Sequence, residues 1–188
     1  INDDSYLYGH WQSEKYFKDF ENAIREDFEF KSSLKGKNLS LAERIQSTQS
    51  VSIHVRRGDY VNNKVNLERH GICSLGYYMA SYEFMRQKIF NPVFFIFSDD
   101  IEWAKNNFCF NEECHFINHN QGSDSYMDMQ LMTLCKHHVI ANSSFSWWGA
   151  WLGKSEGQFV IAPQPWFNDH SMDCKDILPK TWHILPRV

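Results

Sequence analysis

The sequence lacks the features that mark several large classes of protein. No apolar run approaches the ~18 residues that a membrane-spanning helix needs. The five cysteines are odd in number and show no CxxC spacing, which favours buried thiols in a reducing compartment over a disulfide framework. There is no P-loop and no GxGxxG motif, so ATPase and ordinary dehydrogenase functions lose support.

Positive charge is also scarce. The chain has 19 Lys and Arg against 23 Asp and Glu, a net charge of −4. This balance provides no general positive field for nucleic acid or an anionic membrane, so we expect no nucleic-acid partner and at most peripheral membrane contact. Any anion that the protein binds must be held by a local cluster of donors.

What the sequence does have is apolar and aromatic material. Of its 188 residues, 43% are hydrophobic and 16% aromatic, which is enough for a packed core and too much for a disordered tail. In the first 50 residues, apolar positions at three- and four-residue steps predict one helix over 16–28 and a shorter one over 39–45, with a break at 35–38.

From residue 51 onward the pattern changes to short β-rich runs at 51–55, 93–97, 115–117, 138–141 and 159–162. Helical patterns separate these runs, among them 78–89 and 127–134. Strands that alternate with helices indicate βαβ units and a parallel sheet covered on both faces. The predicted fold class is therefore a doubly wound α/β domain.

A polar segment follows each predicted strand. The segments are Arg56–Asp59, Ser98–Asp100, Asn118–Asp128, Asn142–Ser144 and Pro163–Trp166. Ligands of open parallel sheets bind beyond the carboxyl ends of the strands. We therefore expect these segments to converge on one edge and to bind a phosphate-bearing ligand.

The first segment offers two guanidinium groups at a strand end. Arg56 and Arg57 supply planar donors suited to phosphate, Gly58 permits a tight turn, and Asp59 can orient one arginine. The alternatives are a surface ion pair, or an Arg-Gly-Asp adhesion signal. His54 lies on the same strand face as Arg56, where it either reaches the ligand or is a hydrogen-bonded core histidine.

The fourth segment leads into a predicted helix that begins near Ser144. The free N–H groups of such a helix start, with the hydroxyl groups of Ser143 and Ser144, would form an anion-binding site opposite the arginines. The alternative is an ordinary serine N-cap. The tryptophans that follow are expected to pack in the core.

Four aspartates are further candidates. Asp124 and Asp128 lie one helical turn apart, and we assign helix capping to Asp124 and ligand contact to Asp128, whose carboxylate can accept both edge donors of a guanine. Asp99 and Asp100 could bind Mg²⁺ or Mn²⁺ beside a diphosphate or could cap the following helix. Because two arginines are available to neutralise phosphate, no metal is required.

A zinc site is the other metal possibility. Its candidate ligands fit no common zinc-binding spacing, so we expect none; they are Cys109, Cys114, His115, His119, His137 and His138.

Together these segments closely resemble the α-1,2-fucosyltransferases, glycosyltransferase family 11. The resemblance rests on HVRRGDY at 54–60, SDD at 98–100, Asp128 and ANSSFSWWGAWL at 141–152. It extends over nearly the whole chain, including 8–17 near the start and 162–166 near the end. The pairing of the first and last motifs is far more specific than either motif alone.

The resemblance implies an inverting transfer of fucose from GDP-β-L-fucose to the 2-hydroxyl of a terminal galactose, without a metal. It places Arg56 and Ser144 at the β-phosphate, Arg57 as a support for the loop, and His54 and Asp128 at guanine. We assign Arg56 and Asp59 as catalytic, with Asp59 and Glu68 as candidate bases unless Asp59 merely orients arginine. The residues assigned to substrate binding are His54, Arg57, Asp99, Asp128, Ser143 and Ser144.

We therefore predict a galactoside 2-α-L-fucosyltransferase of bacterial surface-glycan assembly. Two alternatives are a GDP-sugar transferase with a different sugar or acceptor, and a non-catalytic module that binds a guanine-nucleotide sugar. Members of the family carry a GLGNQ stretch that this chain lacks. The expected division is thus a helical leading segment at 1–50 and a GDP-fucose-binding, Rossmann-like domain at 51–188 of a GT-B-type enzyme, with the start of the other lobe absent.

The expected location is the bacterial cytoplasm, with the Golgi lumen as the alternative. The chain opens at Ile1 without a recognisable leader. Asn38-Leu39-Ser40 and Asn142-Ser143-Ser144 match the N-glycosylation sequon, but the second lies in the predicted phosphate site. Chance matches in a cytoplasmic protein are the simpler explanation.

Overall fold

The computed structural model describes residues 4–6, 8 and 13–188, so 9–12, which belong to the first stretch of the resemblance, lie outside the described residues. The leading helices are η1 (Glu14–Tyr16), η2 (Lys18–Phe20), α1 (Glu21–Asp27) and α2 (Gly36–Ser47). The strands are β1 (Gln49–Val55), β2 (Pro92–Ser98), β3 (Cys114–Ile117), β4 (His137–Val139), β5 (Val160–Gln164) and β6 (His183–Pro186). The remaining helices are α3 (Gly58–Asn62), α4 (Lys64–His70), α5 (Leu75–Lys88), α6 (Ile101–Asn107), η3 (Gly122–Asp124), α7 (Tyr126–Leu134) and α8 (Ser144–Leu152).

The six strands form one parallel sheet in the order β3-β2-β1-β4-β5-β6. This is the order of a Rossmann-like, doubly wound sheet, and it confirms the predicted fold class. The chain winds outward from β1 to β3, then returns to add β4 beside β1. The strand order therefore reverses between β1 and β4, which is where ligands of such sheets bind.

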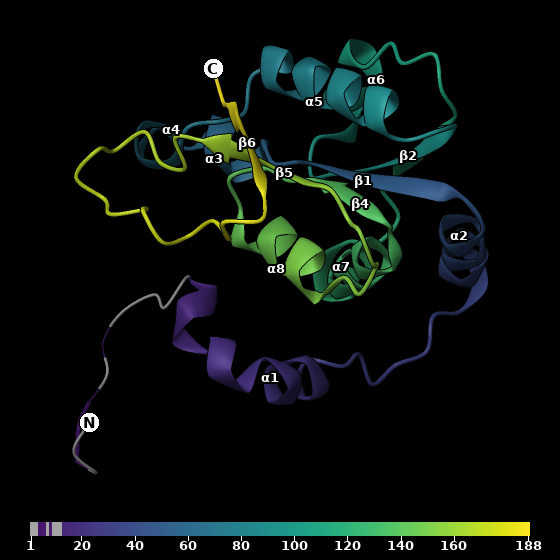
Figure 1. Ribbon diagram of the computed structural model, residues 1–188. Helices are drawn as coiled ribbons and strands as arrows, with labels where there is room; N and C mark the ends of the chain where they lie inside the picture. The colour runs from purple at the N-terminus through teal and green to yellow at the C-terminus, as the bar shows by residue number, and fades with distance from the viewer. Residues whose placement is uncertain (1–3, 7, 9–12) are drawn as a thin grey trace.

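Helices cover both faces of the sheet (Figure 1). On one face, α5 and α6 pack over Val51, Ile53 and Val55 of β1. On the other face, α2 and α7 pack over Phe95 and Phe97 of β2, and α8 lies beside α7. Because successive strand residues point to opposite faces, a strand buried on both faces favours apolar residues throughout, which explains the apolar run at 93–97 of β2. In β1 the apolar residues alternate with buried polar ones, Ser50, Ser52 and His54.

The leading segment differs from the single helix predicted over 16–28. It is divided into η1, η2 and α1, and Phe17, between the first two, has non-helical backbone angles (φ −136°, ψ 10°). This break lets the Phe17 ring lie 5.6 Å from Trp148 and 5.1 Å from Trp151 of α8, while Phe28 stacks on Trp148 at 4.9 Å. Contact with the tryptophans of α8 therefore overrides the local helical pattern.

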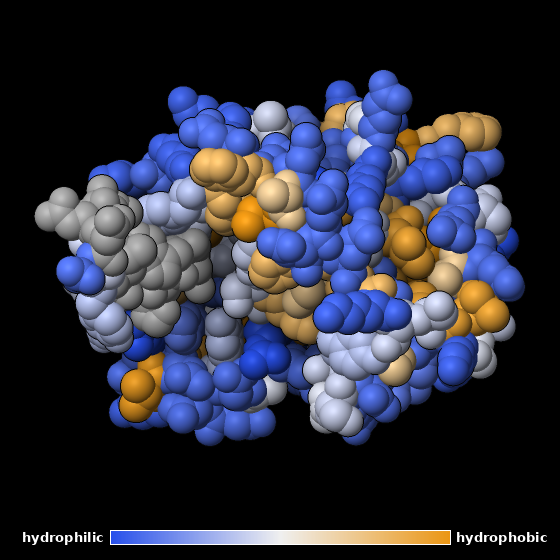
Figure 2. Space-filling model, turned by 90° about the horizontal axis from the view of Figure 1, so that it is seen from below, coloured by the Kyte–Doolittle hydropathy of each residue, from blue (hydrophilic) through white to orange (hydrophobic). Residues whose placement is uncertain are grey.

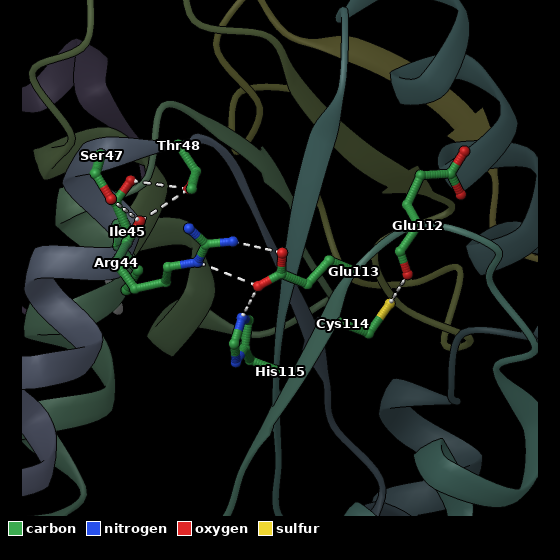
Figure 3. Close-up of polar contacts among 8 residues, drawn as sticks. All are labelled: Arg44, Ile45, Ser47, Thr48, Glu112, Glu113, Cys114 and His115. Carbon is green, nitrogen blue, oxygen red and sulfur yellow. Dashed lines mark hydrogen bonds and ion pairs between the residues drawn. The ribbon is translucent and has the colours of Figure 1, made fainter.

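The second leading helix starts earlier than predicted, since α2 begins at Gly36 and includes part of the expected break at 35–38. Its buried residues Ala42 and Ile45 pack in the same cluster as α7. At its other end, Arg44 forms an ion pair with Glu113, whose carboxylate also contacts His115 at 2.7 Å on β3 (Figure 3). Thus α2 contacts the outermost strand of the sheet as well as α7.

A polar contact not expected from the sequence joins the loops beyond β4 and β5. The side-chain nitrogen of Asn142 lies 2.9 Å from the carbonyl of His70, 3.3 Å from that of Gly71 and 3.1 Å from that of Trp166. Asn142 is only 2% exposed. One buried amide therefore connects the loop after α4 with the segments after two strands.

Strand β6 was also not predicted, because it is short, lies at the sheet edge and carries little apolar pattern. Arg187, directly after it, is buried and donates to the carbonyls of His70 and Ile72 at 3.0 and 3.4 Å. Gly71 lies against this arginine with φ +66°, and a Cβ atom there would lie 2.0 Å from the Arg187 guanidinium. The position therefore requires glycine both for its backbone angle and for space.

One face of the molecule shows how polar and apolar residues are distributed on the surface. Seen from below, it is largely hydrophilic, with apolar residues in separate patches (Figure 2). Among the described residues, no helix combines the length and apolarity needed to cross a bilayer.

Replacing Asn142 by alanine should destabilise the fold strongly, because the carbonyls of Gly71 and Trp166 lose their side-chain donor and that of His70 keeps only Arg187. We expect Asn142→Ala to lower the free energy of unfolding by roughly 3 kcal/mol, which at this chain length corresponds to a fall in Tm of about 6–12 °C. Thermal unfolding provides the measurement. Asn107→Ala, which removes a single 2.8 Å bond to the carbonyl of Trp103, is the matched control and should cost about 1 kcal/mol; equal losses would contradict the interpretation.

Candidate functional site

A cavity of about 440 Å³ opens beyond the carboxyl ends of β1, β2 and β3. Its volume falls within the range of about 300–1,000 Å³ that is typical of small-molecule sites. Four of the predicted site residues line it together, namely His54, Arg56, Asp99 and Asp128. The other lining residues are Phe97, Ser98, Ile101, Asn118, Asn120, Gln121, Gly122, Ser125 and Phe145.

Arg56 is held between two carboxylates. One terminal nitrogen lies 2.7 Å from Asp59 Oδ1 and the other 3.1 Å from Asp99 Oδ2. Its guanidinium also lies 5.5 Å from the ring centre of Tyr60. The two aspartates orient the group but offset its charge, so the arginine pair is not the open positive cluster that the sequence suggests. A bound anion would have to exchange with a carboxylate or use the remaining N–H groups of Arg56.

Arg57 turns away from the cavity. Its Nε donates to Asp100 at 3.2 Å, and its guanidinium lies 4.2 Å from the ring centre of Trp103 on α6. Its backbone N–H donates to Asp99 at 2.8 Å. The geometry makes Arg57 a support for the loop after β1 and places Arg56 alone in the cavity.

Gly58 allows Asp99 to approach this loop closely. A Cβ atom at Gly58 would lie 2.8 Å from Asp99 Oδ2, closer than side chains tolerate. The glycine of the motif therefore serves the contact between the loops after β1 and β2. Asp100 caps α6 by accepting from the N–H of Trp103 at 3.2 Å, which confirms the capping alternative for that residue.

Asp128 lies in the first turn of α7 and is partly buried. Its Oδ1 accepts a hydrogen bond of 2.6 Å from the side chain of Asn120. Burial raises its pKa to about 6, although the Asn120 donor acts in the opposite direction. The capping role assigned to Asp124 is wrong, because Asp124 lies in the separate turn η3 and Ser125 occupies the N-cap position of α7.

His54 is 5% exposed, and its ring lies 5.4 Å from that of Phe145. Its Nδ1 is buried and has no hydrogen-bond partner among the residues that the structure describes. Burial, aided by the nearby Arg56 charge, lowers its pKa to about 3. The ring is therefore neutral at pH 7, and its Nδ1, buried without a partner, does not support the hydrogen-bonded core role.

The two serines lie at the start of α8, as predicted, but they do not line the cavity. Ser143 occupies the N-cap position with extended backbone and forms no side-chain cap, which argues against the ordinary N-cap alternative. Ser144 is exposed. Only the next residue of α8, Phe145, reaches the cavity wall, so a ligand held by His54 or Arg56 would have to extend outward to reach the serine hydroxyl groups.

In the described part of the chain, the side chains do not form the arrangement that a Mg²⁺, Mn²⁺ or zinc site would need. There, no group of three or more His, Cys, Asp and Glu side chains converges as a metal site would. Asp99 and Asp100 are instead both engaged by arginines. Cys114 and His115 contact Glu112 and Glu113 respectively, on opposite sides of the strand, as Figure 3 shows.

Sequence reasoning missed Asn120 and Asn38. The segment 118–128 was recognised as polar, but nothing in its pattern distinguished Asn120 from its neighbours. Asn38 lies some eighty residues earlier, on α2, and bonds to Asn120 in both directions. It is buried, as is Asn142, so neither sequon asparagine is accessible to a glycan in the folded protein.

Comparison with known proteins gives consistent results. The model of the family described as Glycosyl transferase family 11 matches residues 2–185. An alpha-1,2-colitosyltransferase of Escherichia coli is 43% identical over 93% of this chain and 60% of its own length. The O-antigen biosynthesis glycosyltransferase WbnK of the same species is 37% identical over 65% of this chain and 40% of its own.

A more distant relative is the Galactoside 2-alpha-L-fucosyltransferase SEC1 of Bos taurus, 32% identical over 54% of this chain and 28% of its own length. The chain thus spans at most 60% of these three relatives. No solved structure matches it.

The buried histidine should make stability depend on pH. His54 has a folded pKa of about 3 against about 6.5 unfolded, so its contribution is complete above pH 6.5 and is lost as the pH falls toward 3. Denaturant unfolding should show His54→Gln less sensitive than wild type to acidification from pH 6.5 to 5, by about 1.4 kcal/mol per pH unit. The raised pKa of Asp128 makes stability depend on pH in the opposite direction, but Asp128 is present in both proteins, so its contribution cancels in the comparison. Parallel curves would refute the assignment.

Proposed function

The chain belongs to glycosyltransferase family 11, and we propose that it is the donor-binding part of an inverting galactoside 2-α-L-fucosyltransferase. In this proposal, L-fucose passes from GDP-β-L-fucose to the 2-hydroxyl of a terminal galactose. The observation that carries it is the joint presence of His54, Arg56 and Asp128 in one cavity beyond the carboxyl ends of β1, β2 and β3. Its proposed setting is bacterial surface-glycan assembly, in line with the name of the WbnK relative.

The part of the cavity around Asp128 and His54 suits a guanine base. An ionised Asp128 presents acceptor oxygens to the N1–H and the exocyclic amine of guanine, two adjacent donors that adenine does not offer in this arrangement. The His54 side chain lines the same cavity, and Phe97, Ile101 and Phe145 supply apolar surface. A neutral purine with a polar edge fits these groups better than a phosphate would.

The diphosphate is placed at Arg56. As the bond between the anomeric carbon and the phosphate oxygen breaks, its electron pair stays with GDP and the negative charge there grows. A guanidinium at that position stabilises the transition state more than the ground state, which is the condition for catalysis. We further propose that the serine hydroxyl groups and free N–H groups at the start of α8 supply the remaining donors, so that no metal is needed.

The acceptor oxygen would then attack the anomeric carbon from the face opposite GDP and lose its proton. Asp59 is 49% exposed in its side chain and borders Arg56. If phosphate displaces it from Arg56, its carboxylate becomes free to accept this proton. Glu68, the other candidate base, is exposed on α4 and paired with Lys64 at 3.8 Å. Neither carboxylate lines the cavity, but Asp59 is in contact with Arg56, which does, and this makes Asp59 the preferred residue.

A second candidate is the transfer of colitose. The relative named as an alpha-1,2-colitosyltransferase is 43% identical and aligned over 93% of the chain. Colitose is fucose without its 3-hydroxyl group, so the two sugars would place the same demands on the nucleotide site. Donor choice would then be decided around the sugar, outside the cavity of His54 and Asp128.

Removing the Arg56 guanidinium should weaken the binding of GDP. A hydrogen bond to a charged group contributes about 1.5–3 kcal/mol, so Arg56→Ala is expected to raise the Kd for GDP by roughly 10- to 100-fold in calorimetric titration. Arg56→Lys keeps the charge but loses the planar donors, so its Kd for GDP should lie between those of wild type and Arg56→Ala. Arg86→Ala, which removes an exposed arginine paired with Glu83 and Glu112, is the matched control. An unchanged Kd in Arg56→Ala would exclude Arg56 from the site.

Donor specificity can be tested directly with the purified protein. With a lactose acceptor, we expect GDP release from GDP-fucose, at the same rate with and without EDTA. Faster turnover of GDP-colitose would favour the second candidate. Binding of GDP without turnover of either donor would leave the non-catalytic binding module as the better description, and a loss of activity in EDTA would contradict the metal-free mechanism.

A further inference from the structure

A pair of buried asparagines connects α2 to the wall of the cavity. Asn38 Nδ2 donates to Asn120 Oδ1 at 2.7 Å, and Asn120 Nδ2 donates back to Asn38 Oδ1 at 3.0 Å. Both residues are buried, with 6% and 7% exposure. Asn120 lines the cavity and Asn38 does not, so the pair extends from a ligand-facing position into the interior between two helices.

This pairing fixes the direction of the Asn120 amide. Its oxygen is engaged by Asn38, and its nitrogen donates both to Asn38 and, at 2.6 Å, to Asp128 Oδ1. If the amide were reversed, its oxygen would face the carboxylate and two acceptors would oppose each other. Asn38 is therefore what keeps a donor, and not an acceptor, pointed at Asp128.

Asn38 is in turn fixed by two neighbours. Its oxygen lies 2.6 Å from His119 Nε2, which must donate because the amide oxygen only accepts. Its nitrogen also reaches the sulfur of Met127 at 3.2 Å. His119 Nδ1 is buried without a partner in the described part of the chain, and burial lowers the pKa of His119. The ring is thus neutral with its proton on Nε2, as the contact requires.

We propose that Asn120 is a positioning residue for Asp128, held in its donating orientation by Asn38, and that this pair keeps the Asp128 carboxylate ionised to accept hydrogen bonds from the guanine edge. The ligand part of this inference rests on the proposed function. Among the described residues, Asn120 alone donates a hydrogen bond to the Asp128 carboxylate, so the remaining acceptor positions of that carboxylate are available to a base with adjacent N–H donors. A protonated carboxyl group would lose one of those positions and introduce a donor.

The charged and titratable groups around Asp128 leave the hydrogen bond from Asn120 as the main polar interaction that stabilises its carboxylate. Across the cavity, β1 contributes His54, which stays neutral above about pH 3, and Arg56, which is paired with Asp59 and Asp99. From α2, Lys37 acts on His119. The adjoining turn η3 carries Asp124, which is exposed. From α8 the cavity receives Phe145, an uncharged side chain.

The test measures the Kd for GDP of the full chain at a series of pH values between 5 and 8 and locates the midpoint at which binding weakens toward acid pH. Without the Asn120 donor, the pKa of Asp128 should rise above its present value of about 6. We expect Asn38→Ala and Asn120→Ala to move the midpoint upward by about one pH unit relative to wild type, which weakens binding roughly fivefold at pH 6 and less than twofold at pH 7.5. The ionisation of the GDP phosphate is common to all proteins compared and cancels.

Two controls separate positioning from general damage. Ser40→Ala changes an exposed residue on the same helix and should leave the midpoint in place. Asn38→Ser keeps a small polar group and provides a second variant if Asn38→Ala unfolds, with folding checked by thermal denaturation. A purely structural role for the pair would weaken binding equally at every pH, and that result would overturn the inference.

A second measurement does not depend on the ligand. Carbon-detected NMR titration of the aspartate carboxyl groups, with Asp128→Asn for assignment, should show Asp128 titrating near pH 6 in wild type and higher in both asparagine variants. Equal values in all three proteins would refute the positioning role. If wild type binds no GDP but the NMR shift occurs, the proposed function fails while the positioning of Asp128 by Asn120 stands.

Discussion

The parallel pairing of β2 with β1 on one side and β3 on the other brings together the chain segments that form most of the cavity. In this register Val55 is level with Ser98, and Phe97 is level with Ile117, so three chain segments leave the sheet side by side. Arg56, Asp99 and Asn118 then enter the same volume, although about sixty residues separate the first from the last. The apolar side chains that bury both faces of the sheet maintain this alignment, and the chemistry of the site depends on it.

Around the cavity, the positive charges of the arginines are balanced by neighbouring aspartates. Arg56, in the cavity, is paired with Asp59 and Asp99, and Arg57, which supports the loop from outside the cavity, is paired with Asp100. Such a site costs less to keep folded without ligand than an uncompensated positive cluster would, since like charges are not forced together. It also selects its ligand, because an anion must compete with a carboxylate for Arg56 and a weakly charged ligand gains little from the exchange.

Much of this arrangement could be predicted from the sequence because it follows from periodicity and position. The strands from 51 onward, the helix that begins at Ser144 and the four cavity residues all lie where alternation and strand ends indicate. The leading helix and the Asp124 cap were misjudged because contacts with Trp148 and the turn at 122–124 outweigh local preference. Asn38 lay beyond prediction, since a bond between side chains on separate elements leaves no periodic trace, and β6 was missed because an edge strand of four residues need not be apolar.

The burial of Asn38 and Asn142 bears on how the protein can be produced. Both asparagines stand in sequons, and each uses its side-chain amide to join distant segments. In a eukaryotic secretory host, oligosaccharide is added while the chain is still unfolded, and a glycan on either nitrogen would replace an N–H donor that the native structure uses. Expression in the cytoplasm of a bacterial host avoids this modification. In a eukaryotic secretory host, replacing the sequon serine at Ser40 or at Ser144 would distinguish which of the two glycosylation sites obstructs folding.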